Sequence, residues 1–234
     1  MIASLIWGAV AAVSLVVGSV LAMLRRWAPR PIGIVLGFGA GALMASIAFE
    51  LWEQGYDAGG AIPLVIGLAV GAMSYFLANR LVTRVAARAG TAAGVPLAVG
   101  ALLDGIPEQL VLGIGLAAGE GVSVALIVAI FVSNLPESIG SSADMLGARS
   151  ARRSVLLLWV GVAVLCMLAT VAGFLVADNT GGAFQAGASG FAAGALLVML
   201  VDSMVPEAQE KAKDLTGLAT VIGFTVAAGL SLLG

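Results

Sequence analysis

The sequence predicts an all-α membrane protein, and three features support this prediction. Hydrophobic residues make up 61% of the 234-residue chain and charged residues only 10%, whereas soluble domains are about half apolar and about a quarter charged. The apolar runs are about 20 residues long, which is the length that a helix needs to cross a bilayer. They are apolar on every side, which disfavours the alternating pattern of a membrane β-barrel. We therefore expect a multi-pass protein embedded in a lipid bilayer.

In chain order, the apolar runs predict about eight transmembrane helices within a single transmembrane domain, 1–234. The first four predicted spans are 2–24, which stops at Arg25; 31–51, which stops before Glu53; 61–78, which stops before Arg80; and 95–118. The last four are 122–146, which stops before Arg149; 155–177, which stops at Asp178; 183–205, which stops before Glu207; and 215–233. The first span is a poor signal peptide, because its positive charges follow the apolar run.

The positively charged residues predict the orientation of the chain. All 11 lysines and arginines lie in alternate connections between the predicted spans. They are Arg25, Arg26 and Arg30 after the first span, Arg80, Arg84 and Arg88 after the third, Arg149, Arg152 and Arg153 after the fifth, and Lys211 and Lys213 after the seventh. The positive-inside rule places these connections in the cytoplasm and both termini outside.

Two pairs of similar segments indicate an inverted internal repeat. Residues 37–44 of the second span read GFGAGALM, and residues 190–197 of the seventh read GFAAGALL. The fourth span contains DGIPE at 104–108, and the fifth contains SNLPE at 133–137. The two spans of each pair run in opposite directions in the predicted topology. Inverted repeats with helices broken near the midplane are typical of secondary transporters, although the small residues alone also fit close helix packing.

Carboxylates inside the two central spans mark the expected site, because ionisable groups are costly there. Asp104 and Glu108 are four residues apart, so both project from one helical face, and Ser133 and Glu137 repeat this spacing. The proline before each glutamate leaves a carbonyl one turn earlier free for a ligand. Together with Asn134, these groups predict an all-oxygen cation site. Protons are the alternative, since no predicted span contains a basic residue that neutralises the carboxylates.

Three further acidic residues are candidates for the ion pathway. Glu50 and Glu53 lie at the outer end of the second span, where they fit an entrance, although an interfacial position without a role is about as plausible. Asp202 lies late in the seventh span, at the position that we match to Glu50 in the repeat. It fits an inner exit, or a solvated position near the surface.

The two central motifs resemble those of the ZIP (Zrt/Irt-like) family of divalent metal transporters, and more narrowly its bacterial GufA-like branch. That family carries His-Asn-x-Pro-Glu-Gly on its fourth helix and His/Gln-x-x-Pro-Glu-Gly on its fifth, which form a binuclear metal site. The matching stretches here are 104–109 and 133–138. The resemblance implies two three-helix blocks around a central helix pair, a bacterial inner-membrane location, Glu108 and Glu137 as bridging ligands, and Asn134 at a further ligand position.

The chain departs from this family at the metal ligands. It contains no histidine, and Asp104 and Ser133 stand at the two histidine positions. Zinc favours nitrogen and sulfur donors but also accepts carboxylates, whereas a set of oxygen donors suits Mn²⁺ or Mg²⁺. We therefore expect a transporter that moves a divalent cation toward the cytoplasm, with zinc, manganese, iron and magnesium all open as the substrate, and with no other cofactor.

Other classes of function compete with this expectation. One is a ZIP-fold protein that has lost metal transport and carries protons or another solute, or acts as a scaffold. An intramembrane aspartyl protease using Asp104 and Asp202 is disfavoured, because neither residue lies in a Gly-x-Gly-Asp motif. Without histidine the chain also lacks the usual base of a serine or cysteine hydrolase, so we expect no enzyme. We expect no nucleic-acid partner, and the small-residue faces allow a homodimer.

Overall fold

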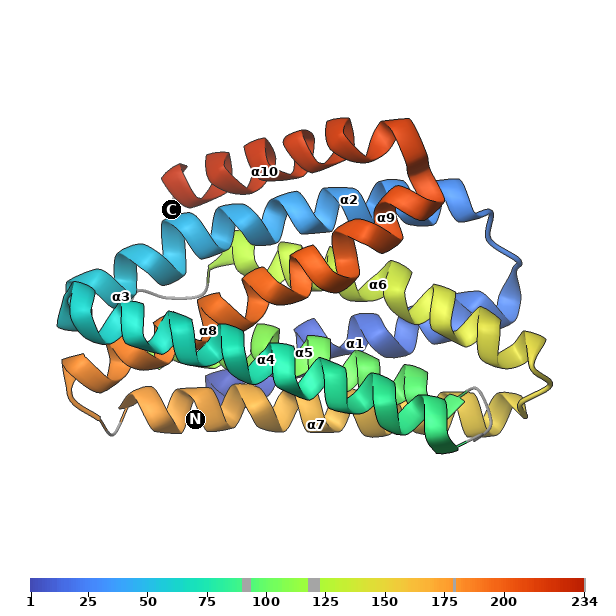
Figure 1. The fold of residues 1–234 in the computed structure, drawn as a ribbon, viewed down its shortest axis with the longest axis horizontal. Coiled ribbons are helices and arrows are strands. Elements are labelled where there is room, and N and C mark those ends of the chain that lie inside the picture. The colour runs from blue at the N-terminus through green and yellow to red at the C-terminus, as the bar shows by residue number, and fades with distance from the viewer. Residues whose placement is uncertain (90–93, 118–122, 179, 234) are drawn as a thin grey trace.

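The computed structural model describes residues 1–89, 94–117, 123–178 and 180–233, with side chains described outside 85–99, 101, 178 and 233. All regular secondary structure in these ranges is helical (Figure 1). The predicted all-α fold class is therefore confirmed for this part of the chain. The predicted span ends at 118 and 122, and the side chain of Arg88, lie outside the described residues.

The helices follow one another with short connections. The first five are α1 (Ile2–Leu24), α2 (Pro29–Ser46), α3 (Trp52–Gly59), α4 (Ala61–Ala89) and α5 (Gly94–Ala117). The next five are α6 (Val124–Gly147), α7 (Arg152–Asp178), α8 (Gly182–Met199), α9 (Val205–Ala212) and α10 (Thr216–Leu233). A π-helical turn, η1 (Ile47–Leu51), joins α2 to α3, and another, η2 (Leu200–Met204), joins α8 to α9. A 3₁₀ turn, η3 (Lys213–Leu215), leads into α10.

Local chemistry explains where several helices begin and end. Helix α2 begins at Pro29, where the missing N–H has no intrahelical partner to lose. Helix α6 is capped by Ser123, whose hydroxyl accepts the N–H of Leu126 at 3.0 Å. Helix α3 ends at Gly59 and is followed by Gly60, which has φ 81°, a conformation that favours glycine. At Lys213 (φ 53°) the chain turns, and α10 runs back alongside α2 (Figure 1).

Six helical stretches among the described residues are long and apolar enough to cross a membrane. They are Ile2–Leu24, Pro29–Gly59, Ala61–Arg84, Val124–Gly147, Arg152–Ala177 and Gly182–Leu232. These stretches indicate a multi-pass membrane protein. The last one has 51 residues but is folded back at Lys213, and α5 is not one of the six. The count of eight spans stays a prediction.

The prolines do not break the central helices, which corrects the expectation of helices interrupted there. Pro107 lies inside α5 and Pro136 inside α6, and both helices continue through them. A proline removes only one backbone hydrogen bond, and neighbouring helices can support the gap. The departures from regular α-helix lie instead at η1 and η2. Each of these π-helical turns follows an α-helix of 18 residues and precedes one of 8 residues.

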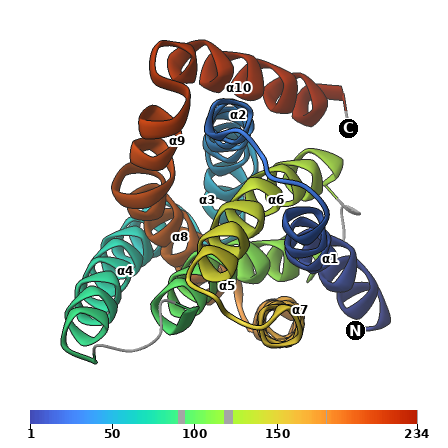
Figure 2. The same cartoon turned by 90° about the vertical axis from the view of Figure 1, so that its right-hand side faces the viewer.

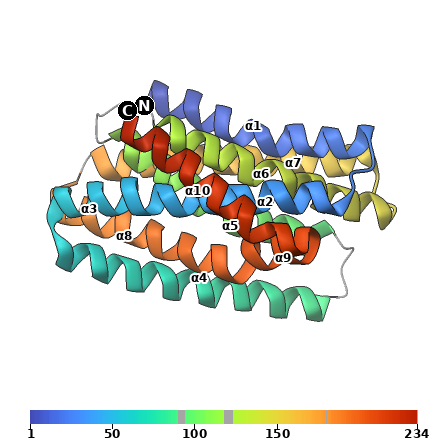
Figure 3. The same cartoon turned by 90° about the horizontal axis from the view of Figure 1, so that it is seen from above.

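The helix pairs also form a reciprocal arrangement. Helix α4 packs on α8, and α10 packs on α2, while α5 packs on α7 and α6 on α1. Figure 2 looks along the bundle and shows α5 and α6 between α1 and α7 on one side and α2 and α8 on the other. Both termini lie at the same end of the bundle (Figure 3). The C-terminal end of α4 and the connections that follow α1, α6 and α9 lie at the opposite end (Figure 1).

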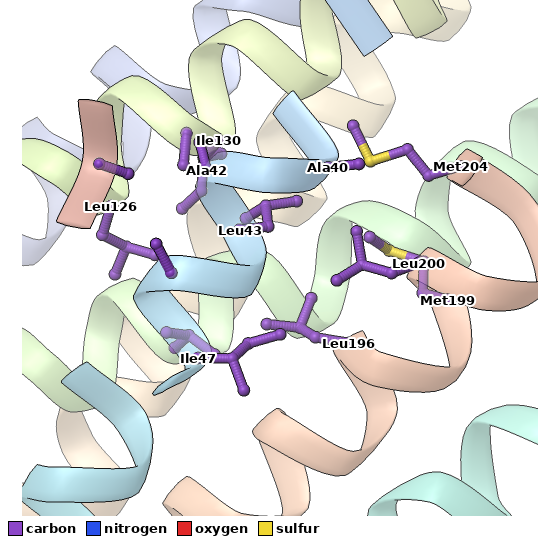
Figure 4. Close-up of a cluster of buried hydrophobic side chains, with 14 of the residues drawn as sticks. Ala40, Ala42, Leu43, Ile47, Leu126, Ile130, Leu196, Met199, Leu200 and Met204 are labelled. Carbon is purple, nitrogen blue, oxygen red and sulfur yellow. The ribbon is translucent and has the colours of Figure 1, made fainter. Parts of the chain in front are cut away.

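The main core lies where α2 and η1 meet α6, α8 and η2. Leu43, Ile130, Leu196 and Leu200 are buried there and belong to one cluster (Figure 4). Glycines bring the outer helices close: a Cβ added at Gly194 of α8 would lie 2.0 Å from a backbone carbonyl oxygen of α4. This packing holds α8 and η2 against the central pair, where the predicted site residues lie.

Candidate functional site

The structure brings most of the predicted ligands to one cavity of about 170 Å³. Asp104 and Glu108 of α5 line it, together with Ser133 and Glu137 of α6. Asn134 is buried on α6 at 1% exposure but does not line the cavity. The remaining wall comes from α2, α5, α6, α8, η2 and α9: Leu36, Gly100, Ser141, Met199, Ser203, Met204 and Glu207.

Hydroxyl groups hold two of the carboxylates. The Ser133 hydroxyl donates to Oε1 of Glu108 at 3.0 Å, and the buried Oε2 of Glu108 has no hydrogen-bond partner. The Tyr75 hydroxyl donates to Oδ1 of Asp104. Tyr75 comes from α4 and is itself buried. The carboxylates are therefore positioned by neighbours while oxygen atoms remain free to bind a positive charge.

A fourth carboxylate and a lysine complete the charges around the cavity. Glu207 of α9 lines the wall and accepts a hydrogen bond from the Lys211 ammonium at 2.5 Å. No predicted span contains a basic residue, but Lys211 lies just beyond the seventh predicted span and pairs with Glu207. The predicted seventh span ends at 205, whereas the helix continues to Ala212 because backbone hydrogen bonding outlasts the apolar run. The i,i+4 spacing of Glu207 and Lys211 is the sequence signal that points to this pair.

The carboxylates line the wall of the cavity and do not form a ready-made metal cage. Across the residues with described side chains, no group of three or more aspartate, glutamate or cysteine side chains is placed to hold a metal ion. A cation in this cavity would therefore bind through a few protein oxygens and retained waters. Mg²⁺ is bound in this way in many proteins, because it gives up its waters reluctantly.

The three candidate pathway residues lie in different environments. Glu50 is in η1, is only 8% exposed, and accepts hydrogen bonds from Ser123 at 2.6 Å and Ser231 at 2.9 Å. Glu53 is exposed on α3. Asp202 is also exposed, and it lies on a separate groove with residues of α4 and α8. The structure therefore brings none of the three to the main cavity.

The register of the two π-helical turns corrects the match between Asp202 and Glu50. Glu50 is the fourth residue of η1, and the fourth residue of η2 is Ser203. Ser203 lines the cavity, whereas Asp202 lines the separate groove. The sequence prediction matched Glu50 to the acidic residue Asp202, whereas the helices align Glu50 with the next residue, Ser203. Tyr75, Ser203 and Glu207 are thus the site residues that sequence reasoning missed.

No protein-family model matches this chain, and no curated protein matches its sequence. The likeness to the ZIP family therefore rests on the two central motifs and on the predicted topology.

Proposed function

We propose that this chain transports a divalent cation through the cavity between α5 and α6. The observation that carries the proposal is charge: Asp104, Glu108, Glu137 and Glu207 line one cavity. Of these, Glu207 is paired with Lys211, and the other three form no salt bridge with any described residue. Unpaired carboxylates at membrane depth are costly and mark ion pathways. A bound cation would neutralise them.

The donor set favours a hard cation that keeps part of its water. Carboxylate and hydroxyl oxygens are ligands that suit Mg²⁺ and Mn²⁺. A water molecule takes about 30 Å³ of liquid volume, so 170 Å³ leaves room for an ion with several waters. Structural zinc sites are instead dry and four-coordinate, mostly with nitrogen or sulfur ligands. We rank Mg²⁺ and Mn²⁺ above Zn²⁺ as substrates.

The arrangement of the helices supports a transporter built on an inverted repeat. Two inverted three-helix blocks would produce two series of elements with matching lengths. The series α2, η1, α3 matches the series α8, η2, α9 element by element. Helix α4 packs on α8 as α10 packs on α2, which such blocks would also produce. In this reading α5 and both limbs of Gly182–Leu232 also cross the membrane, which makes about eight crossings. Movement of one block against the other would then expose the site to each side in turn.

The cavity faces the end of the bundle that we predict to be cytoplasmic. Its α5 residues, 100–108, lie between the end of α5 that follows the Arg80–Arg88 segment and just past the middle of the helix. Its α6 residues, 133–141, lie from just before the middle of α6 toward the end that precedes Arg149. The positive-inside rule places both of these connections in the cytoplasm. The arrangement therefore fits release of the cation toward the cytoplasm.

Cation uptake into proteoliposomes tests the proposal. We expect the double variant Glu108→Gln/Glu137→Gln to lose at least about tenfold in Mn²⁺ or Mg²⁺ uptake, since even outer-shell partners of a metal cost about 10- to 100-fold. Asp144→Asn is the matched control, because Asp144 is an exposed acidic residue on the same helix as Glu137. Uptake that survives the double substitution would overturn the proposal.

Proton movement is the second candidate function. Two observations favour it. Hydroxyl groups donate hydrogen bonds to Asp104 and Glu108, and the described side chains contain no three-ligand cluster for a metal. A pH-sensitive dye inside metal-free liposomes distinguishes the two candidates. Proton flux that needs no metal and disappears in Glu108→Gln would support proton transport, and its absence would leave the divalent cation as the substrate.

A further inference from the structure

Glu50 of η1 accepts hydrogen bonds from residues of two other parts of the bundle. One of its oxygens, Oε1, accepts both the Ser123 hydroxyl of the α6 cap and the Ser231 hydroxyl of α10. The other, Oε2, is buried and has no hydrogen-bond partner. A single carboxylate thus connects three helical elements, and it still has an oxygen that is free to bind a cation.

The surroundings of Glu50 mirror the main cavity on a smaller scale. Glu50 and Gln54 line a cavity of about 10 Å³ against the far halves of α5 and α6. The main cavity of about 170 Å³ lies against the first half and middle of α5 and the middle and second half of α6, with Ser203 and Glu207 at the corresponding positions of η2 and α9. The segments η1–α3 and η2–α9 have the same backbone pattern, but only η1 has a carboxylate, Glu50, at its fourth position. The cavity beside Glu50 is the small one of the two.

We propose that Glu50 closes the outer half of the ion pathway, and that an entering divalent cation opens it by competing with the two serine hydroxyls for the Glu50 carboxylate. This inference rests on the proposed transport function and adds an outer binding step to it.

The donors around Glu50 explain both the closure and its release. Hydrogen bonds to a charged group are stronger than those between neutral groups, and Ser123 lies at the N-terminus of α6, the end of a helix where negative charge is stabilised. The side-chain amide oxygen of Gln54, Oε1, lies 3.9 Å from where a Cβ added at Gly115 of α5 would be, and both residues line this small cavity. A cation bound by Glu50 and Gln54 would replace the serine hydroxyls and free α10 and the start of α6.

Chemical labelling of a thiol placed in the small cavity tests this gate. Gly115→Cys introduces the thiol there, and its Cβ would meet no close contact, because the nearest heavy atom lies 3.9 Å from the Cβ position. The natural Cys166 is buried and is replaced by alanine. We expect the introduced thiol to react slowly with a membrane-impermeant thiol reagent applied from the outside. Glu50→Ala should raise the labelling rate about tenfold or more, since the loss of even one of its two hydrogen bonds to a charged group predicts a change of this size.

Two controls separate gating from unfolding. Asp57→Ala removes an exposed acidic side chain from the adjoining α3 and should leave labelling of the introduced thiol unchanged. In a parallel set without the Gly115 substitution, Ser141→Cys reports on the main cavity. With the reagent applied from the predicted cytoplasmic side, it should label equally with and without Glu50. Ser231→Ala provides a milder variant that keeps the carboxylate, and it should raise labelling in the Gly115→Cys protein by a smaller factor.

The cation part of the proposal has its own outcome. Millimolar Mn²⁺ or Mg²⁺ should speed labelling of the Gly115→Cys protein when Glu50 is present and have no effect in Glu50→Ala. Unchanged labelling in Glu50→Ala and Ser231→Ala would overturn the gate, and cation-independent labelling with Glu50 intact would overturn its opening by a cation. If the intact protein takes up no divalent cation but Glu50→Ala still exposes the introduced thiol, the proposed substrate fails and the gate stands.

Discussion

Substitution of a single glycine in the seam between α4 and α8 should weaken the bundle. A Cβ added at Gly194 would lie 2.0 Å from the Leu68 carbonyl oxygen and 2.9 Å from the Ala72 nitrogen. Both atoms belong to the backbone of α4, so no side chain can rotate away. Restoring an ordinary contact of 3.4 Å requires the helices to part locally by about 1.4 Å, the difference between the two distances.

The expected cost follows from this displacement. Forcing an extra methyl group into a well-packed site costs about 1–3 kcal/mol, and we expect Gly194→Ala to lie at the upper end because the contact is with backbone. Gly161→Ala is the matched control: Gly161 lies in α7, and no heavy atom lies within 4 Å of its Cβ position. That substitution should stabilise the helix by about 0.5–1 kcal/mol through helix propensity alone.

Unfolding in mixed micelles with increasing denaturing detergent, followed by tryptophan fluorescence, measures both effects. The reasoning predicts changes of opposite sign for the two substitutions. A Gly194→Ala protein that unfolds at the same detergent fraction as the parent would refute it, and so would equal destabilisation by the two alanines.

Two further substitutions test buried polar contacts. Thr170→Val removes the hydroxyl that donates to Oε1 of buried Gln109 at 2.5 Å. Because Nε2 of Gln109 already lacks a partner, the free energy of unfolding should fall by about 1–3 kcal/mol in the same assay. Thr170→Ser keeps the hydroxyl and should retain most of this stability. Lys211→Gln removes the partner of Glu207 and leaves the cavity more negative, so Mn²⁺ affinity measured by titration should rise; an equal or lower affinity would contradict this.

Most of the helices could be predicted from the sequence, because each apolar run carries its own signal. Helix α1 has the bounds predicted for the first span, and within the described residues the other predicted spans overlap helices. The errors lie at helix ends and at breaks. Residues 52–59 and 206–212 are polar enough to end an apolar run, yet they remain helical. The prolines of α5 and α6 predicted breaks, whereas the irregular turns lie at η1 and η2, which contain no proline.

The candidate site could be predicted only where its residues share one helix. Asp104 with Glu108, and Ser133 with Glu137, follow from a spacing of four residues, and all four line the cavity. Tyr75 and Glu207 lie on α4 and α9, far from α5 in the sequence, and nothing local indicates that they meet Asp104 or its cavity. The burial of Glu50 and its contacts with Ser123 and Ser231 likewise depend on where α6 and α10 pack.

The sequence by itself determined the membrane environment, the approximate helices, the alternation of basic connections and the two carboxylate motifs. Only the tertiary structure decided which helices meet, that Glu207 and Lys211 join the cavity, and that Glu50 lies in a small closed cavity while Ser203 lines the larger one. The physical reason is that apolarity directs a helix into lipid without selecting its neighbour, because lipid tails are as apolar as leucine side chains. The neighbour is selected by close fits such as Gly194 against Leu68, and these exist only once the helices have packed.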